Sequence, residues 1–596
     1  MLIAGRFAAS QPKLPDSDDM RFYADWAMRI ASGKWTDGQA FYGLPGYPFC
    51  LAAIFHLTQP DQFYVSVIQA LFDSLTALLI FKIARELFSI SREANDSGAS
   101  HTNPEVIGSF AAFVWIVYQP AQTFSVILMP TAWLVLAFWS SVWVVIRTRV
   151  ATAWWPWFGL GLCAGLMALM VATILFLIPL FVVAAALTVG RPDGWKFRVP
   201  RIALSAAILF AGVFLGTSPA WLHNYFVAKD PVMLSAHSGL NFWMGNNPEA
   251  TGYPKIPDGL SAGQEGLLRD SITRAEEEAG RKLKRSEVSK YWSGKAGRWV
   301  HGNRAAWIAL LGVKVRNFWN AFQYDDLSEI TLLRETGVLT PGLRFGIVAA
   351  LGLPGMLIAS IRFRRARWVA AAVLLHMCAL LPVFITERYR LCAVPGLAIF
   401  AAFVVWEIWG SLSRSRWLGL LGILALVAAS SWFVSLPQRD PALWALDPFN
   451  TGLKHLRAGR LDLAQQKLDA AHRLVPDNSE INFGLGNLWF AKGDTDRARG
   501  FYRRAIELSP RHTGALNNLA RVETLARNWD EAEQCLRASI AVDPASVKSH
   551  FLLAEMEFAK GDLIAARAAL AKAFALRPDQ PELIELQHKL DASPAP

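Results

Sequence analysis

The sequence is poor in cysteine and in charged residues. Its five cysteines are scattered along 596 residues, and none forms a CxxC pair or a Cys/His spacing typical of metal binding. A disulfide framework is therefore not expected, and cysteine indicates no compartment. Charged residues make up only 18% of the chain and hydrophobic residues 53%. These values average an apolar N-terminal part with an ordinary C-terminal part, so at least two domains are expected.

The N-terminus lacks the apolar core of a cleavable signal peptide, because the stretch from Met1 to Phe7 is too short. A net charge of +11 is compatible with nucleic-acid binding, but the arginines lie between apolar runs. Arginines between apolar segments are typical of membrane proteins, in which they mark the loops on the cytoplasmic side. We therefore expect a lipid bilayer around the chain and no nucleic-acid partner.

Apolar segments dominate the chain as far as Leu436. A bilayer core needs about 20 apolar residues per helix. Segments near that length are 63–82, 106–121, 128–146, 155–171, 172–189, 202–219, 345–361, 368–385, 391–410 and 417–436. They predict a polytopic, all-α membrane domain over 1–436. A shorter stretch, 46–57, is expected to form an interfacial or re-entrant helix.

Arginine and lysine mark alternate loops of this domain. The basic positions are Arg147, Arg149, Arg191, Lys196, Arg198, Arg201, Arg362, Arg364, Arg365, Arg367, Arg414 and Arg416. By the positive-inside rule these loops are cytoplasmic. The other face then holds a first loop, 1–62, a large loop, 220–344, and everything after 437. The basic residues of the first loop do not fit an outer location, so a further transmembrane helix is expected upstream of Met1.

The C-terminal part is a repeat array. Pro476, Pro510, Pro544 and Pro578 are equally spaced along the chain. Small residues precede each proline at fixed distances: Ala464, Ala498, Ala532 and Ala566 lie at one position, and Ala471, Ala505, Ser539 and Ala573 at another, closer to the proline. Turns are expected at Gly459, Gly493, Arg527 and Gly561. The spacing resembles the tetratricopeptide repeat, with its period of about 34 residues, whose units stack into an α-solenoid with a concave groove.

This array is predicted over 447–590, after a linker at 437–446. Its groove is expected to bind a protein or peptide. The alternative is that the array only stiffens or dimerises the protein.

Polar motifs gather in the loops assigned to the outer face. An acidic cluster, Asp16, Asp18 and Asp19, precedes an aromatic helix that contains Tyr23. A Pro-Gly-Tyr-Pro turn follows at 45–48, a Gly-Asn-Asn-Pro segment at 245–248, and Arg-Tyr-Arg at 388–390. As a set, these motifs over about 14–436 resemble the bacterial branch of the protein O-mannosyltransferase-like family. That family belongs to the dolichyl-phosphate-mannose-protein mannosyltransferase superfamily, whose polytopic glycosyltransferases have the GT-C fold.

The resemblance implies transfer of a sugar from a polyprenyl-phosphate donor to an acceptor hydroxyl outside the inner membrane of a bacterium. Asp19 is then the expected base, with Asp18 and Asp16 as fallbacks. Arg388 or Arg390 would bind the donor phosphate. Tyr23, Asn246 and Asn247 are candidate substrate-binding residues, although both asparagines also suit a turn before Pro248. The acidic cluster could hold a divalent cation, but no full set of metal ligands is present.

One departure from the family keeps a second class of function open. Relatives often read Thr-Arg-Pro where this chain has Met170-Val171-Ala172. The change removes polar groups that could touch the donor. It leaves open a different donor or a loss of catalysis, in which case the protein is a membrane scaffold whose repeats assemble an envelope or secretion complex. A transporter is less well supported, because no inverted repeat is obvious.

Overall fold

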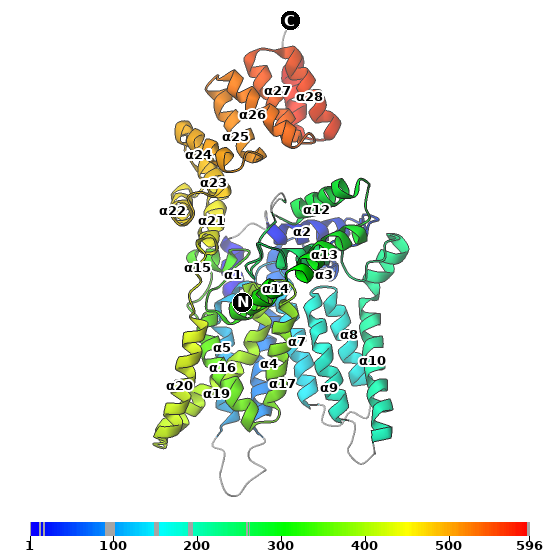
Figure 1. Cartoon of the computed structure of the whole chain (residues 1–596), viewed down its shortest axis with the longest axis vertical. Helices are drawn as coiled ribbons and strands as arrows, with labels where there is room; N and C mark the ends of the chain where they lie inside the picture. Colours follow the sequence, from blue (N-terminus) through cyan, green and yellow to red (C-terminus); the bar gives the residue numbers. More distant parts are fainter. Residues whose placement is uncertain are drawn as a thin grey trace. The chain divides into compact units, whose positions relative to one another are not determined.

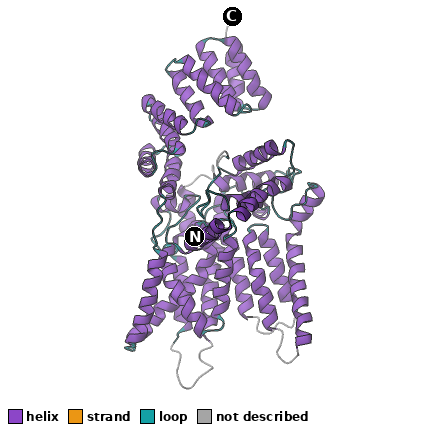
Figure 2. Ribbon diagram, viewed as in Figure 1, coloured by secondary structure: helices purple, strands orange, loops and turns teal. Residues whose placement is uncertain are grey.

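The computed structural model describes residues 2–10, 14–15, 18–89, 102–147, 154–188, 195–257, 260 and 263–592. Over these residues the chain forms helices and no β-strand, apart from one isolated bridge between Tyr118 and Leu343 (Figure 2). The predicted all-α class is confirmed. The chain divides into two compact units, Met1–Gln438 and Arg439–Pro596.

The first unit contains most of the helices (Figure 1). In chain order they are α1 (Leu2–Ser10), α2 (Asp18–Ala31), α3 (Gly46–Leu57), α4 (Gln62–Phe88), α5 (Pro104–Ile116), α6 (Gln119–Phe124), α7 (Thr131–Arg147), α8 (Trp155–Ala168), η2 (Ala172–Leu177), α9 (Ile178–Thr188), α10 (Trp195–Leu222), η3 (His223–Val227), α11 (Ser238–Gly245), α12 (Gln264–Ala279), α13 (Arg285–Gly302), α14 (Arg304–Trp319), α15 (Glu329–Glu335), α16 (Phe345–Arg362), α17 (Ala366–Leu380), α18 (Glu387–Arg390), η4 (Leu391–Ala393), α19 (Val394–Ser413) and α20 (Trp417–Val434).

Each of the ten apolar segments contains helical structure, but the helices differ in length. Within the described residues, five helical stretches are long and apolar enough to cross a membrane: Gln62–Phe88, Ile202–Val227, Phe345–Arg362, Glu387–Ser413 and Trp417–Val434. The other five segments contain shorter apolar helices of 10–17 residues. Segment 46–57 is the short helix α3.

Glycines allow α8 and α10 to pack against each other at close range. A Cβ atom added at Gly161 would lie 2.0 Å from the carbonyl oxygen of Leu209, and one at Gly216 would lie 2.7 Å from that of Leu162. Only a residue without a side chain fits at such distances. The two helices therefore approach through their backbones, as apolar helices commonly do where no hydrophobic effect drives them together.

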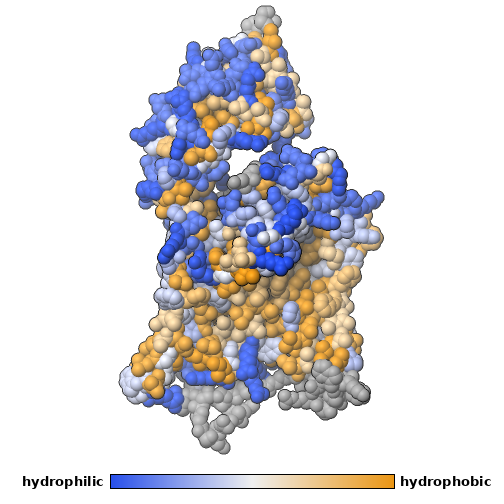
Figure 3. All heavy atoms as spheres, in the orientation of Figure 1, coloured by the Kyte–Doolittle hydropathy of each residue, from blue (hydrophilic) through white to orange (hydrophobic). Residues whose placement is uncertain are grey.

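Polar elements gather at one end of the apolar bundle. Figure 1 shows α2, α12 and α13 at the same end of α4, α7 and α8, together with the short apolar helix α3. In Figure 3 the visible sides of α20 and of α8 to α10 are largely apolar, whereas α12 and α13 are largely polar. The predicted first and large outer loops, 1–62 and 220–344, are therefore largely helical, and they meet at this end.

The second unit is built from helical hairpins. Its helices are α21 (Pro441–Arg457), α22 (Leu461–Leu474), α23 (Ser479–Ala491), α24 (Thr495–Leu508), α25 (Thr513–Leu525), α26 (Trp529–Val542), α27 (Val547–Lys560), α28 (Leu563–Leu576) and α29 (Pro581–Asp591). Helix α21 begins at Pro441, and the Asp440 side chain caps it by accepting from the Ala442 amide at 2.9 Å. A helix thus occupies much of 437–446, where the sequence suggested a linker.

The small repeat residues lie where the helices of each hairpin meet. Ala464, Ala498, Ala532 and Ala566 are all fully buried, and so are the four small residues that lie closer to each proline. Three of the predicted turns hold glycines with φ between 70° and 94°, at Gly459, Gly493 and Gly561. The fourth turn has Arg527 at φ 61°, a conformation that is costly for a residue with a side chain. The repeat pattern therefore predicts the local geometry correctly.

Candidate functional site

Helix α2 carries the first part of the candidate site. Its apolar residues Met20, Ala24, Ala27 and Ile30 are buried, and this spacing places them on one face of the helix. That face fixes α2 against the unit, with α3 as a close neighbour. Asp19 and Tyr23, four residues apart, lie one turn from each other. The aromatic ring of Tyr23 meets that of Tyr47 edge to face, with the ring centroids 5.2 Å apart.

The second part comes from the segment that opens α18. Thr386 caps this short helix by accepting a hydrogen bond from the Tyr389 amide at 3.3 Å. Arg388 then reaches Asp19, which lies 369 residues earlier, with 2.7 Å between Nη1 and Oδ2. Its Nη2 lies 2.9 Å from Oδ2 of Asp326. The three side chains are only 12–17% exposed. Two of the predicted site residues, Asp19 and Arg388, are thus brought together.

The charge state of Asp19 reflects two opposing effects. Burial is the largest single effect on the pKa of Asp19 and raises it, but the charge and hydrogen bond of Arg388, together with the Gln264 hydrogen bond, hold the pKa below its ordinary value. Gln264 of α12 adds a hydrogen bond from Nε2 to Oδ1, at 2.9 Å. Hydrogen bonds and cations that favour the ionised form have this effect. Asp19 is therefore an ionised carboxylate and, while it is paired with Arg388, a weak base.

Two aromatic groups flank this charge cluster. The rings of Tyr42 and His237 stack with centroids 4.6 Å apart. Burial lowers the pKa of His237 to about 4, although the Asp19 charge opposes that shift. The imidazole is therefore neutral at pH 7. Within the described part of the chain, neither Tyr42 Oη nor His237 Nε2 has a hydrogen-bond partner.

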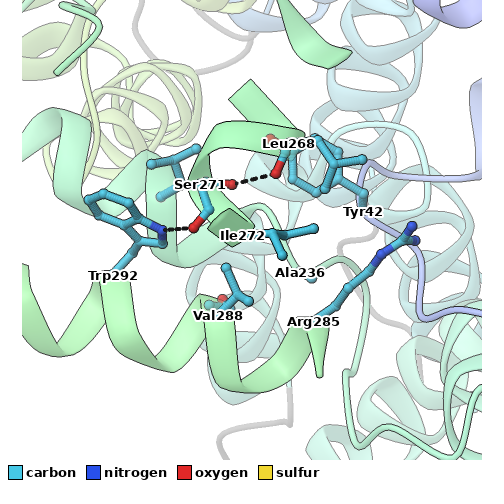
Figure 4. Close-up of a pocket in the computed structure, with 10 residues that line it drawn as sticks. Tyr42, Ala236, Leu268, Ser271, Ile272, Arg285, Val288 and Trp292 are labelled. Atoms are coloured by element: carbon cyan, nitrogen blue, oxygen red, sulfur yellow. Dashed lines mark hydrogen bonds between the residues drawn. The ribbon is translucent and has the colours of Figure 1, made fainter. Parts of the chain in front are cut away.

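A small cleft extends from Tyr42 between α12 and α13 (Figure 4). Leu268 and Ser271 of α12, and Arg285 and Trp292 of α13, line it. The indole of Trp292 donates to the Ser271 carbonyl at 3.2 Å, which joins the two helices. The cleft is therefore a packed, partly apolar neighbour of the Asp19 cluster.

Arg390 does not reach this cluster, and its predicted role in binding the donor phosphate stays a prediction. Its guanidinium is 2% exposed and forms an ion pair with Glu387, which is fully buried. It also donates to the carbonyl oxygens of Asn320 at 2.7 Å and Phe322 at 2.8 Å. The neighbouring ring of Phe345 lies 3.9 Å from its guanidinium carbon. Arg390 is therefore a buried structural residue, with its donors engaged by the protein.

Asn246 and Asn247 have structural contacts in this structure, and their predicted role in binding substrate stays a prediction. The Asn246 amide donates to the carbonyls of Phe242 at 2.9 Å and Pro382 at 2.6 Å. Asn247 donates to Trp243 and accepts from the Glu249 amide at 2.8 Å. Both are buried. They close the C-terminal end of α11, which is the turn role that their position before Pro248 suggested.

The acidic cluster is only partly described. Asp16 lies outside the described residues, and so does the side chain of Asp18, although Asp18 begins α2. Among the side chains that are described, no group of three or more His, Cys, Asp or Glu could hold a metal ion. The suggestion that this cluster holds a divalent cation stays a prediction.

Three neighbours of Asp19 were missed by the sequence analysis. Asp326 and Gln264 touch the Asp19–Arg388 pair directly, and His237 interacts with it electrostatically. They come from the large loop, where polar residues are common. The Asp325-Asp326 pair was the only available signal, and a pair of acidic residues in a loop is ordinarily solvated surface.

Comparison with known proteins identifies the second unit. Residues 449–513 and 490–555 match family profiles described as tetratricopeptide repeat. A curated relative, BBSome complex member BBS4 of Bos taurus, is 29% identical over 114 residues. That match covers 19% of this chain and 22% of the relative. The chain therefore spans about a fifth of the length of the curated relative that it matches.

Solved structures give distant likenesses. YrrB, described as a tetratricopeptide-repeat protein with an unusual peptide-binding site, is 19% identical with a TM-score of 0.23, covering 30% of this chain and 90% of its own. TTC0263 of Thermus thermophilus is 18% identical with a TM-score of 0.23, covering 32% and 96%. PilF of Pseudomonas aeruginosa is 14% identical with a TM-score of 0.23, covering 41% and 97%. From the profile matches and the equal spacing of the prolines, residues 449–555 of the second unit carry tetratricopeptide repeats.

Proposed function

We propose that the first unit is an integral membrane glycosyltransferase of the GT-C type. It would take a sugar from a polyprenyl-phosphate carrier and transfer it to an acceptor hydroxyl, on a protein or on an envelope glycan or lipid. The site would face the outside of a bacterial inner membrane. The repeat domain would lie on that same outer side.

The observation that carries this proposal is the buried contact between Asp19 and Arg388, at 2.7 Å. It joins an acidic and a basic group that the family resemblance had separately marked as catalytic and phosphate-binding. It also lies where polar helices cover one end of an apolar bundle (Figure 1). A lipid-linked donor has its phosphate at such a boundary, with its chain among apolar helices.

The chemistry needs few protein groups. The acceptor oxygen attacks the anomeric carbon, the bond from that carbon to the phosphate oxygen breaks, and the electron pair leaves with the lipid phosphate. Asp19 receives the proton of the acceptor hydroxyl. Arg388 neutralises the charge on the departing phosphate, as guanidinium groups do well. Tyr23, one turn from Asp19, would contact the sugar or the acceptor.

The repeat domain supplies a docking function. Tetratricopeptide arrays form a concave groove between stacked hairpins, and a protein or peptide that binds there would be held beside the membrane. In the transferase proposal this partner is the acceptor or an assembly protein. The repeat matches support equally a second candidate, a non-catalytic membrane scaffold that assembles an envelope or secretion complex.

A genetic complementation separates the two candidates. The gene is deleted and restored with the native protein, with Asp19→Asn, or with Asp25→Asn, an exposed carboxylate on the same helix that pairs with Arg21. Membrane levels are matched, and envelope glycans and glycoproteins are profiled by mass spectrometry. The transferase proposal expects a sugar that is lost on deletion, returns with the native protein and Asp25→Asn, and stays absent with Asp19→Asn. An unchanged glycan profile on deletion would favour the scaffold.

A further inference from the structure

Arg388 is shared by two carboxylates. Its two terminal nitrogens contact Asp19 at 2.7 Å and Asp326 at 2.9 Å, and both carboxylates are largely buried. One cation therefore faces two anions in a site proposed to receive a third anion, the donor phosphate. Buried like charges repel strongly. The Nε of Arg388 is buried and has no hydrogen-bond partner among the described residues. A phosphate that also takes up a terminal nitrogen of Arg388 must displace one of the two carboxylates.

The backbone ties Asp326 to Arg388. The Glu387 amide, next to Arg388, donates to the carbonyl of Tyr324 at 2.9 Å, two residues before Asp326. Arg390, two residues after Arg388, donates to the Asn320 and Phe322 carbonyls of the same loop. The Asp325 side chain braces the loop from the other side by accepting from the Ile330 amide at 2.7 Å. Asp326 and Arg388 thus lie on one connected frame.

Asp19 lies outside the frame that joins Asp326 to Arg388. It lies on α2, and it contacts Arg388 and Gln264 of α12 through its side chain. The burial that fixes α2 involves Met20, Ala24 and Ala27 rather than the carboxylate. Asp19 can therefore separate from Arg388 without disturbing the frame that holds Arg388, whereas Asp326 belongs to that frame.

From this difference we infer that Arg388 has one permanent and one exchangeable partner: Asp326 positions the guanidinium, and the donor phosphate displaces Asp19. The inference rests on the proposed function and adds that the donor phosphate controls the basicity of Asp19. Without donor, Asp19 is paired and a weak base. When the phosphate takes its place on Arg388, Asp19 loses the cation that suppresses its basicity and can accept the proton of the acceptor hydroxyl. Donor binding thus activates the base.

Binding of a sugar-free probe tests the inference directly. The intact protein is placed in nanodiscs of neutral lipid, and its affinity for a polyprenyl monophosphate is measured, with the corresponding polyprenol as the uncharged control. Asp19→Asn removes the internal competitor and should tighten binding about tenfold, near the lower limit found for close charge pairs. Asp326→Asn frees the guanidinium and should weaken binding about tenfold. Asp326→Glu should retain most of the affinity, and Asp25→Asn should change nothing.

The opposite changes in affinity expected for Asp19→Asn and Asp326→Asn distinguish a displaced carboxylate from a positioning one. If Asp326→Asn tightens binding as Asp19→Asn does, Asp326 is only another negative charge, and the inference is overturned while the proposed function stands. If Asp326→Asn does not fold, Asp19→Asn decides alone, because unchanged or weaker binding would overturn the exchange. If the native protein binds polyprenol as well as polyprenyl monophosphate, the phosphate site itself is refuted and the proposed donor with it.

Discussion

Replacing Arg390 should destabilise the first unit strongly. The guanidinium is 2% exposed and its partner Glu387 is fully buried. Arg390→Gln would leave that carboxylate with the Tyr118 hydroxyl at 2.6 Å and the Gln323 amide at 3.3 Å as hydrogen-bond donors. Breaking a buried ion pair by removing one partner typically costs about 3–5 kcal/mol, because the other charge stays buried. The carbonyls of Asn320 and Phe322 would lose a donor as well.

Thermal unfolding of the intact protein in detergent, followed by tryptophan fluorescence, measures this effect. Arg390→Gln should lower the melting temperature by several degrees. The double variant Arg390→Met with Glu387→Gln removes both charges and should recover most of the loss. Arg362→Gln is the matched control, because its pair with Glu407 is 52% exposed on the arginine side and such pairs contribute about 0–1 kcal/mol. An Arg390→Gln protein that melts like the native one would refute the structural role and restore Arg390 as a candidate phosphate ligand.

Three further variants test separate parts of the account. Gly161→Val places atoms against the Leu209 carbonyl and should lower the free energy of unfolding by more than about 1 kcal/mol. The control Gly159→Val, which meets open space, should not. Equal effects of the two variants would contradict the close packing of α8 and α10. Arg527→Gly relieves the positive φ of 61° and should stabilise the second unit by up to about 1 kcal/mol. Hydrogen exchange in α25 and α26 should then be slower. Faster exchange would contradict backbone strain at Arg527. The pKa of His237 is lowered from 6.5 to about 4 in the folded state, so folding releases protons and stability should fall as pH drops through that interval. His237→Phe should remove that part of a melting-temperature profile against pH and exposed His56→Phe should not; an unchanged profile would contradict a buried neutral imidazole.

The repeat domain was predictable because its constraints are local. A hairpin needs small residues where its helices meet and a glycine-like turn, and both recur in each repeat, so Ala498 and Gly493 could be assigned from spacing alone. Arg527 breaks the turn pattern in sequence, yet the structure keeps the left-handed conformation there. Backbone hydrogen bonds from the Arg527 amide to Thr524 and from the Asn528 amide to Glu523 hold that turn on an unfavourable residue.

The candidate site was predictable only in part, because its contacts are long-range. Asp19 and Arg388 were found through a family resemblance, and helix α2 brings Asp19 to Arg388. Nothing local distinguishes Arg388 from Arg390, since both stand in one short basic motif. Their surroundings in the fold decide their roles: the guanidinium of Arg390 lies among the carbonyls of Asn320 and Phe322. That of Arg388 lies between Asp19 and Asp326. Asp326 was missed for the same reason, because it and its partner Arg388 lie far apart in the sequence.

The most direct test of the central claim is to locate the lipid phosphate on the protein. A photoreactive polyprenyl monophosphate is incubated with the intact protein, irradiated, and the labelled peptides are mapped by mass spectrometry. We predict labelling of α2 near Asp19 and of the segment at Arg388, competed by unlabelled polyprenyl monophosphate and abolished by Arg388→Gln. Label spread over the lipid-facing surfaces of the apolar helices, and unchanged by Arg388→Gln, would contradict the claim that this pair forms a donor site.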